Sequence, residues 1–264
     1  MLDMREAARA QALTLDVGLL TESEREMAVV TWRGRMVNEH VSARVFAGLV
    51  PQLMTAGVDV RLQLEVASMI QEELRHGVLC AAAVEALGGE ARAPLPTLDS
   101  VPQHDDCGPL EGLLRNILSI CCLSETVAVA LITAERLETQ PEELQVALTE
   151  ILGDEVGHAR FGWRLLDELA PRIDDALRER LGDYLPVAFL HLLNYELAHL
   201  PVQANPPSDL VEGYGVCNGR DARALFYDTI TTVIVPELQA RGLPGEAAWS
   251  VARAEYEAAS EPLI

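Results

Sequence analysis

The chain has 264 residues, of which 49% are hydrophobic but only 5% aromatic, and its formal net charge is −21. The hydrophobic fraction is enough for a substantial core, and the abundance of alanine, leucine and valine suits packed helices better than sheets. The negative charge argues against a nucleic-acid partner, because contacts with phosphates need a basic face. We expect the charge to serve solubility, with the attraction of cations as the alternative.

The sequence also bears on the compartment. No apolar run approaches the roughly 20 residues that a membrane helix needs, and the first eleven residues, MLDMREAARAQ, lack the apolar segment of a secretory signal. The five cysteines include no CxxC pair and have irregular spacing, which argues against a disulfide framework. We therefore expect a cytoplasmic protein with no membrane partner.

Helical periodicity dominates the first third of the chain. The first predicted helix spans 21–50, opening on Thr21 and Glu24 with the spacing of a capping box and ending near a proline. After a short turn, a second helix is predicted over 59–87. The proline-containing segment 88–108 is then expected to be a loop of about 20 residues, which is long for a compact domain.

Two further helices follow this loop. The third is predicted over 109–138. Thr139 is the expected N-cap of the fourth, with Pro141 at or near its first position, and this helix runs to about residue 169.

The last third of the chain has a less regular pattern. A helix is predicted over 172–199 with a break near 183–186, followed by a loop-like segment over 200–218. A long helix over 219–241 comes next, and a short helix and a tail are expected in 242–264.

Each of the four helices predicted between residues 21 and 169 carries one glutamate in the middle of its apolar stripe. In chain order these glutamates are Glu39, Glu73, Glu125 and Glu155. The second and fourth begin ExxH motifs, which end at His76 and His158. An isolated buried carboxylate costs several kcal/mol unless it is paired, protonated or bound to a metal. Four of them, with two histidines, need a common explanation.

The spacing predicts that the four acids lie at one height. Glu39 and Glu73 are nearly equidistant from the first turn, and Glu125 and Glu155 are equidistant from the second. Equal distance from the turn of an antiparallel hairpin means equal height. The loop at 88–108 can span about 66 Å when extended, enough to return along the bundle, so both hairpins can bring their acids to the same level.

Four carboxylates and two imidazoles supply the mixed oxygen and nitrogen donors that suit a pair of iron or manganese ions. The anionic ligands would offset the charge of two divalent cations. The alternative is a metal-free bundle whose charged groups are solvated on its faces. That alternative is weakened because the acids lie within the apolar stripes rather than opposite them.

The order Glu, ExxH, Glu, ExxH on four successive helices resembles the ferritin-like di-iron carboxylate proteins. The resemblance implies an all-α fold with a ferritin-like four-helix bundle over 21–169, a long crossover between its second and third helices, and additional helices over 170–264 packing on it, all in a single domain, 1–264. The implied metal ligands are Glu39, Glu73, His76, Glu125, Glu155 and His158.

The resemblance also implies roles for neighbouring residues. The ExxH glutamates would bridge the metals, and each histidine would bind one of them. The acids before the two motifs, Glu72 and Asp154, resemble the family's DExRH signature. Each lies four residues before the histidine of its own motif, and either could orient a metal-binding histidine. Arg75 matches the arginine of that signature, whereas Gly157 replaces it in the second copy.

The implied function is that of an O2-dependent non-haem di-iron oxygenase or oxidase, with two Fe ions, or Mn/Fe, as cofactor and O2 as co-substrate. The substrate would be small, organic and largely apolar. Hydroxylation, desaturation, N-oxygenation and C–C cleavage all remain open. Ile151 stands where aromatic N-oxygenases of the superfamily have a third histidine, which argues against that ligand set. Nothing resembles a flavin or nicotinamide fold, so an external electron donor, a reductase or ferredoxin, is expected.

Rival functions stay open at this point. A ferroxidase or iron-handling protein is mildly favoured by the negative charge, and a metal-free interaction bundle is the third possibility. The helices after residue 170 could close a substrate pocket, or they could only cap the bundle or form the face of a homodimer.

The other histidines and the buried cysteines have simpler expected roles. His40 is expected to lie on the surface or to support the metal ligands from behind them. His191 and His199 are expected to have a hydrogen-bonded structural role rather than to bind metal. Cys80 and Cys121 fall on the core faces of their helices as small buried side chains, with lining of a substrate channel as the alternative.

Overall fold

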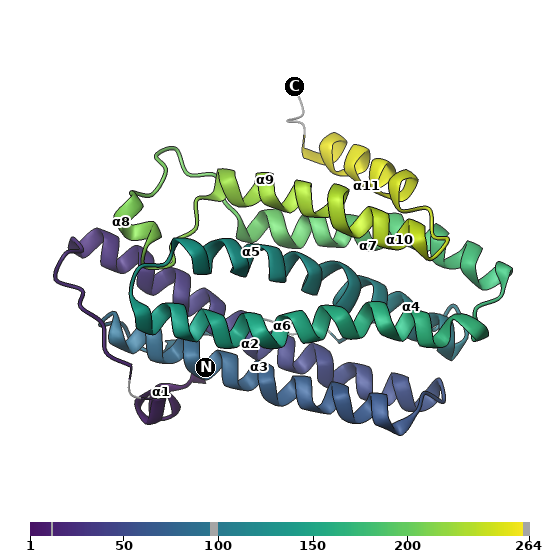
Figure 1. The fold of residues 1–264 in the computed structure, drawn as a ribbon, viewed down its shortest axis with the longest axis horizontal. Helices are drawn as coiled ribbons and strands as arrows, with labels where there is room; N and C mark the ends of the chain where they lie inside the picture. The colour runs from purple at the N-terminus through teal and green to yellow at the C-terminus, as the bar shows by residue number, and fades with distance from the viewer. Residues whose placement is uncertain (12, 96–99, 261–264) are drawn as a thin grey trace. The chain divides into compact units, whose positions relative to one another are not determined.

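The all-α prediction is confirmed by a computed structural model (Figure 1). The structure describes residues 1–11, 13–95 and 100–260. The expected C-terminal tail falls largely on residues 261–264, which lie outside the described residues. Two short strands pair antiparallel, β1 (Leu2–Asp3) and β2 (Arg92–Ala93), so the crossover segment is not wholly irregular.

The chain divides into two compact units, each made of segments that are distant in sequence. Unit 1 consists of residues 1–101, 132–154 and 204–218, and unit 2 of residues 102–131, 155–203 and 219–264. Two of the boundaries fall inside continuous helices, α5 (Glu125–Glu138) and α6 (Glu142–Leu169). The division into a bundle and a C-terminal extension stays a prediction.

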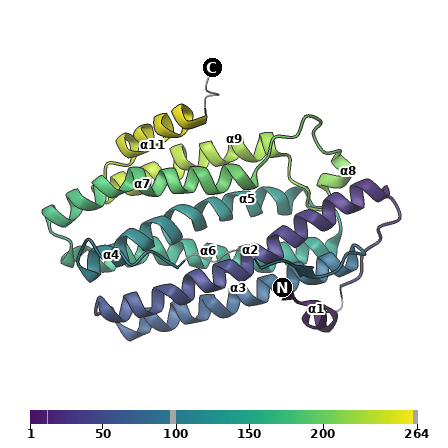
Figure 2. The same cartoon turned by 180° about the vertical axis from the view of Figure 1, so that it is seen from behind.

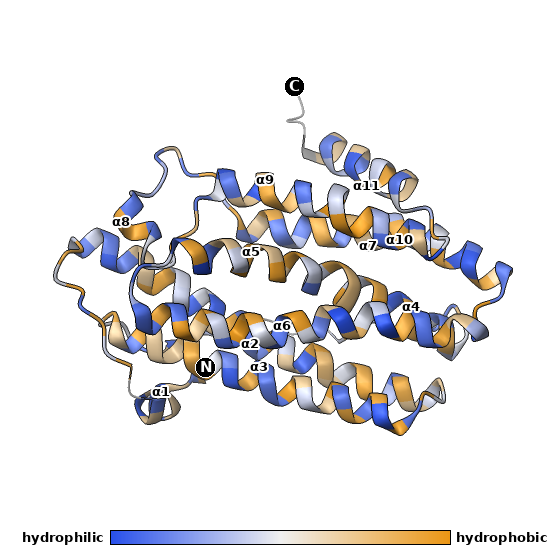
Figure 3. Cartoon of the chain, in the orientation of Figure 1, coloured by the Kyte–Doolittle hydropathy of each residue, from blue (hydrophilic) through white to orange (hydrophobic). Residues whose placement is uncertain are grey.

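In unit 1, α2 (Glu22–Thr55) and α3 (Val60–Ala86) form an antiparallel hairpin, and both views show them side by side (Figures 1 and 2). The short helix α1 (Arg5–Gln11) packs against α3, and α8 (Asp209–Glu212) packs against α2. Polar and apolar residues alternate around the two long helices (Figure 3), as expected of helices that bury one face.

The start of α2 confirms the predicted capping box. The backbone N–H of Glu24 donates to Oγ1 of Thr21 at 3.3 Å, and the backbone N–H of Thr21 donates to Oε2 of Glu24 at 3.0 Å. These bonds satisfy backbone donors that a helix start leaves without intrahelical partners.

The end of α2 lies further along than predicted, because Pro51 does not stop the helix. One more turn follows it, to Thr55. Leu49 and Leu53, on either side of the proline, are fully buried, and this packing offsets the hydrogen bond that proline cannot make.

The core of unit 1 brings α2, α3 and the N-terminal half of α6 together with the segment around α8. Trp32 is fully buried, and its Nε1–H donates to the carbonyl of Tyr214 at 2.9 Å. Gly215 has a φ of 89°, and a Cβ there would lie 3.0 Å from the indole nitrogen of Trp32. A glycine is therefore required where the loop covers the tryptophan.

The predicted helix at 109–138 is interrupted in a way that periodicity does not show. It begins as α4 (Pro109–Ile117), passes through a π-helical segment (Leu118–Ser124) and continues as α5. π-Helical turns inside α-helices are rare and frequently occur at functional sites.

Thr139 does not cap α6 as predicted. Its hydroxyl donates to the carbonyl of Glu135 at 2.8 Å, so it belongs to the end of α5. Helix α6 begins at Glu142, directly after Pro141, whose carbonyl accepts from the N–H of Gln145 at 3.0 Å. After α6, a 3-10 turn (Ala170–Arg172) leads into the next helix.

In unit 2, α7 (Asp175–His199) is continuous, so the predicted break near 183–186 is wrong. Pro186 lies inside it, and buried residues on both sides, including Leu185 and Phe189, hold the helix in place. The remaining elements are α9 (Gly219–Thr229), a π-helical segment (Ile230–Ile234), α10 (Val235–Ala240) and α11 (Gly245–Ser260). The last of these packs along α7, where Phe189 contacts Trp249 at a ring separation of 5.5 Å.

The helical stretch Pro109–Glu138 is long and apolar enough to cross a membrane by length and composition alone, with a mean hydropathy of 2.1 over 18 residues. The expectation that no apolar run approaches the length of a membrane helix is therefore wrong, because the sequence stays apolar on both sides of Glu125. The same test is passed by buried core helices, and 44% of this window is buried. Length and hydropathy alone are therefore weak evidence that this helix crosses a membrane.

Glu196 on α7 generates a prediction about pH and stability. Burial raises the pKa of its carboxyl group to about 7, above the value of the unfolded chain. The folded state therefore holds a proton that the unfolded state releases, and stability falls as the pH rises from about 4.5 to 7. We expect Glu196→Gln to raise the free energy of unfolding by about 1 to 2 kcal/mol at pH 8 and to have little effect near pH 4.5.

Urea denaturation at the two pH values measures this difference. Glu179→Gln is the matched control, because Glu179 lies on the same helix but is exposed. Equal effects of Glu196→Gln at both pH values would contradict the expectation.

Candidate metal centre

The first group of predicted ligands lies within unit 1. Glu39 comes from α2, and Glu73 and His76 come from α3. Each offers one ligand atom, and these three atoms lie within 4.8 Å of one another. Glu73 and His76 are buried, while the side chain of Glu39 is 14% exposed. We call these residues the first trio.

The sequence explains why α3 points its acid and its imidazole inward. Glu73 and His76 are three residues apart, so they share one face of the helix. Val66, Met69 and Cys80 continue the same face and are buried. The apolar stripe therefore carries the two polar groups into the core, as the sequence predicts.

The ring of His76 has a defined orientation. Its Nε2 lies 2.9 Å from Oδ2 of Asp154, and its Nδ1 lies 3.5 Å from Oε2 of Glu39. A carboxylate only accepts hydrogen bonds, so we assign the hydrogen to Nε2, which leaves a lone pair on Nδ1. Two lone pairs facing each other repel unless a cation or a proton lies between them.

The spacing of these atoms fits a metal ion. Neighbouring ligands on a metal with bonds of about 2.1 Å are roughly 3.0 to 3.4 Å apart. The distance of 3.5 Å between Nδ1 of His76 and Oε2 of Glu39 is close to this range. The first trio is therefore a candidate half-site for one metal.

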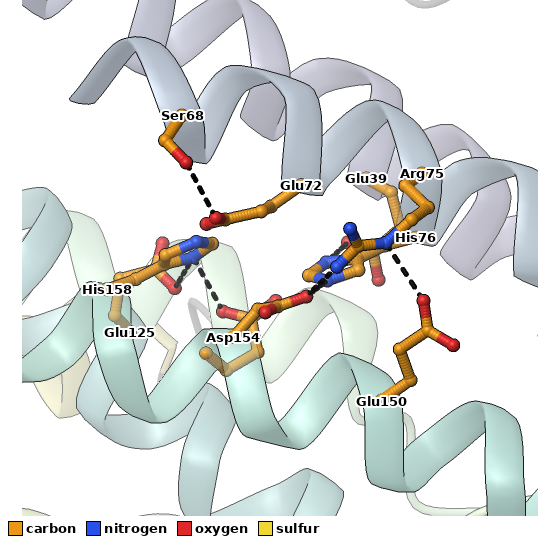
Figure 4. A network of polar contacts seen from close by, with 10 residues as sticks. Glu39, Ser68, Glu72, Arg75, His76, Glu125, Glu150, Asp154 and His158 are labelled. Atoms are coloured by element: carbon orange, nitrogen blue, oxygen red, sulfur yellow. Dashed lines mark hydrogen bonds and ion pairs between the residues drawn. The ribbon is translucent and has the colours of Figure 1, made fainter. Parts of the chain in front are cut away.

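A chain of charged groups holds the far side of the imidazole. Asp154 contacts His76, and Arg75 forms an ion pair with Asp154 and a second one, at 2.9 Å, with Glu150 (Figure 4). A carboxylate that accepts from a metal-binding histidine fixes its tautomer and raises its basicity. Arg75 in turn fixes the carboxylate.

The structure shows which histidine Asp154 contacts. Asp154 lies four residues before His158, but its contact is with His76 of the other motif. Glu72, the acid before the first motif, accepts a hydrogen bond from Ser68 at 2.8 Å. The sequence interpretation missed Glu150. It lies one turn before Asp154 on the same face of α6, a spacing that could have identified it.

The second group of predicted ligands lies within unit 2. Glu125 is the first residue of α5, and Glu155 and His158 come from α6. Their ligand atoms also lie within 4.8 Å of one another, and all three residues are buried. Nδ1 of His158 lies 3.3 Å from Oε2 of Glu155 and 3.8 Å from Oε2 of Glu125. These residues form the second trio. The distance of 3.3 Å lies within the range for two ligands of one metal, and the distance of 3.8 Å is longer.

The remaining predicted positions lie outside the trios. Ile151 is a buried core residue of unit 1. Cys80 and Cys121 are buried, as expected of small core side chains. His191 and His199 are exposed, and Nδ1 of His199 lies 2.8 Å from the carbonyl oxygen of Tyr195. The contact of His199 agrees with its expected hydrogen-bonded role, and the role expected for His191 stays a prediction.

Among the described residues, each unit contains a hollow. A hollow of about 490 Å³ in unit 2 lies between α7 and α11. One of about 330 Å³ in unit 1 is lined by residues of α3 and α6, among them Leu79, Val146 and Glu150. Neither is lined by a residue of the trios, although Glu150 links the smaller one to Arg75.

No protein-family model matches the sequence, and no curated protein is significantly similar to it.

The contact between Asp154 and His76 yields a prediction. Asp154→Asn puts a neutral amide in place of the charged acceptor, so the imidazole loses a partner that raises its basicity. Removing a hydrogen-bond partner of a metal-binding histidine typically lowers the metal affinity 10- to 100-fold. We expect one Mn(II) per chain to bind at least about tenfold more weakly, measured by anaerobic calorimetric titration.

Glu150→Gln is the matched control, because Glu150 contacts Arg75 but not His76. We expect it to reduce the affinity less than Asp154→Asn. The positioning role would be excluded if Asp154→Asn left both Mn(II) affinities unchanged.

Proposed function

We propose that the two trios are the two halves of one dinuclear metal centre of the ferritin-like type. The covalent chain supports this proposal. Asp154 contacts a histidine of the first trio, and the next residue along α6, Glu155, belongs to the second. Consecutive Cα atoms are about 3.8 Å apart, so one stretch of helix serves both trios. The equal heights expected from the sequence support the same arrangement.

The observation that carries the proposal is the pairing of a buried imidazole nitrogen with carboxylate oxygens in each trio. Together the trios supply four carboxylates and two imidazoles. This donor set suits iron or manganese. It contains none of the thiolate ligands found in many zinc sites. The carboxylates would offset the charge of two divalent ions. Burial without metal would be costly for so many acids.

A reduced iron pair held by these residues would bind O2 and supply electrons for its reduction. Hydroxylation, for example, inserts one oxygen atom into a C–H bond of the substrate. The other oxygen leaves as water, using two electrons and two protons from an external reductase or ferredoxin. In this proposal, the residues of the trios bind and orient the ions. Neighbouring apolar side chains such as Met36 and Cys121, which are fully buried, exclude water. We propose an O2-dependent oxidoreductase acting on a small, largely apolar organic substrate.

A ferroxidase is the second candidate, favoured by the net charge of −21, which attracts cations. It would use the same trios, but iron itself would be the substrate. The two functions differ in what is consumed when iron is limiting. An oxygenase or oxidase consumes O2 repeatedly with an electron donor, whereas a ferroxidase consumes it in proportion to the Fe(II) supplied.

Metal stoichiometry tests the proposed centre. We expect anaerobically loaded protein to bind two Fe(II) per chain, and His76→Ala or His158→Ala to bind about one with high affinity, because each removes a ligand from one trio. His191→Ala, which changes an exposed histidine, should still bind two. Less than about one metal per two chains of the wild-type protein would exclude the centre.

Oxygen uptake then separates the two functions. With two Fe(II) per chain and a chemical reductant in excess, an oxygenase or oxidase should consume many O2 per chain when its substrate is present. Uptake that stops once the bound iron is oxidised, under all substrates tried, and resumes only on addition of Fe(II) would favour the ferroxidase.

A further inference from the structure

Helix α6 contains two glycines with opposite surroundings. A Cβ added at Gly157 would meet nothing within 4 Å. A Cβ added at Gly162 would lie 2.5 Å from Cβ of Cys121 and 2.9 Å from the carbonyl carbon of the same residue. Such distances are shorter than those between real Cβ atoms and their neighbours. Gly162 therefore lets α6 approach the π-helical segment Leu118–Ser124 more closely than any other residue would.

This close approach lies beside the second trio. Gly162 is one turn after His158 on α6, and Cys121 is about one turn before Glu125. The two helices run antiparallel here, since Glu125 contacts His158 while Cys121 contacts Gly162. The separation of the backbones at Gly162 thus sets how far Glu125 lies from His158 one turn away.

The π-helical segment adds a second constraint on Glu125. The backbone N–H of Glu125 donates to the carbonyl of Ile120, five residues earlier, and Oγ of Ser124 donates to the carbonyl of Ser119 at 3.2 Å. A π-turn holds one more residue than an α-turn. Without that extra residue, α5 would be rotated by about 100° relative to α4, and Glu125 would point away from His158.

Among the described residues, no glycine beside the first trio is held so closely. Gly77, beside His76, is the nearest equivalent, and a Cβ there would lie 3.6 Å from Cβ of Glu39. That distance is ordinary van der Waals contact. The two trios therefore differ in how their helices are spaced.

We propose that Gly162 and the π-helical segment position Glu125, and so set the metal affinity of the second trio separately from that of the first. This inference rests on the proposed function, since it requires the second trio to bind a metal. Gly162 is a positioning residue. An alanine there would have to displace the backbone of Cys121 by roughly 1 Å, and a binding site must be held to within about 0.5 Å of its working geometry.

Mn(II) titration of three variants in the full chain tests the proposal. Gly162→Ala should weaken the binding of one Mn(II) per chain by at least about tenfold and leave the other unchanged. Gly157→Ala and Gly77→Ala are the matched controls and should both bind two Mn(II) with the affinities of the wild-type protein. In Gly162→Ala, the added substitution Cys121→Gly should not restore binding, because the clash with the backbone remains.

Two results would overturn the proposal. One is a folded Gly162→Ala protein that binds both ions as tightly as the wild type. The other is equal weakening of both sites, which indicates general destabilisation. A wild-type protein that binds no Mn(II) or Fe(II) would overturn the proposed function and this inference together, so the two failures are distinguishable.

Hydrogen exchange of the wild-type protein gives a test that does not depend on the folding of any variant. If Glu125 binds a metal, Mn(II) should slow the exchange of amides in 118–125, because the ion fixes the end of the π-helical segment. Protection of 73–76 by Mn(II) without protection of 118–125 would contradict the role of this segment.

Discussion

The burial of carboxylates against imidazole nitrogens is the constraint on which the rest of this structure depends. In both trios, Nδ1 of a buried histidine faces a carboxylate oxygen, at 3.5 Å from Glu39 in the first and at 3.3 Å from Glu155 in the second. Such contacts are costly in an apolar core unless a cation or a proton lies between the partners. The surrounding features serve this contact: apolar stripes bring the groups inward, Arg75 and Asp154 fix one imidazole, and a π-turn precedes the acid beside the other.

The trios could be predicted from the sequence because their ingredients are local. A glutamate within an apolar stripe, with a histidine three residues later, specifies one face of a helix whatever that helix packs against. The capping box at Thr21 and Glu24 is local in the same way, and it is confirmed. Spacing from a turn also places a residue along a hairpin, which is why Glu39 and Glu73 could be expected to meet.

What the sequence did not reveal depends on packing between distant segments. Pro51 and Pro186 remain inside helices because buried leucines hold the adjoining turns. Periodicity alone could not show the π-helical segment at 118–124, since one extra residue in a turn changes the pattern little. The partner of Asp154 is a histidine 78 positions earlier, so no spacing within its own helix indicates it. The role of Gly162 depends on the close approach of Cys121, which no pattern within its own helix indicates.

We propose that the two trios hold two ions in one shared centre. Electron paramagnetic resonance of the protein loaded with two Mn(II) per chain tests it most directly, since ions that share a bridging carboxylate are magnetically coupled. We expect a spectrum of exchange-coupled Mn(II), with weaker coupling in Glu155→Ala, in which Glu73 remains as the other bridging carboxylate. A wild-type spectrum of isolated Mn(II) at full loading would contradict the shared centre.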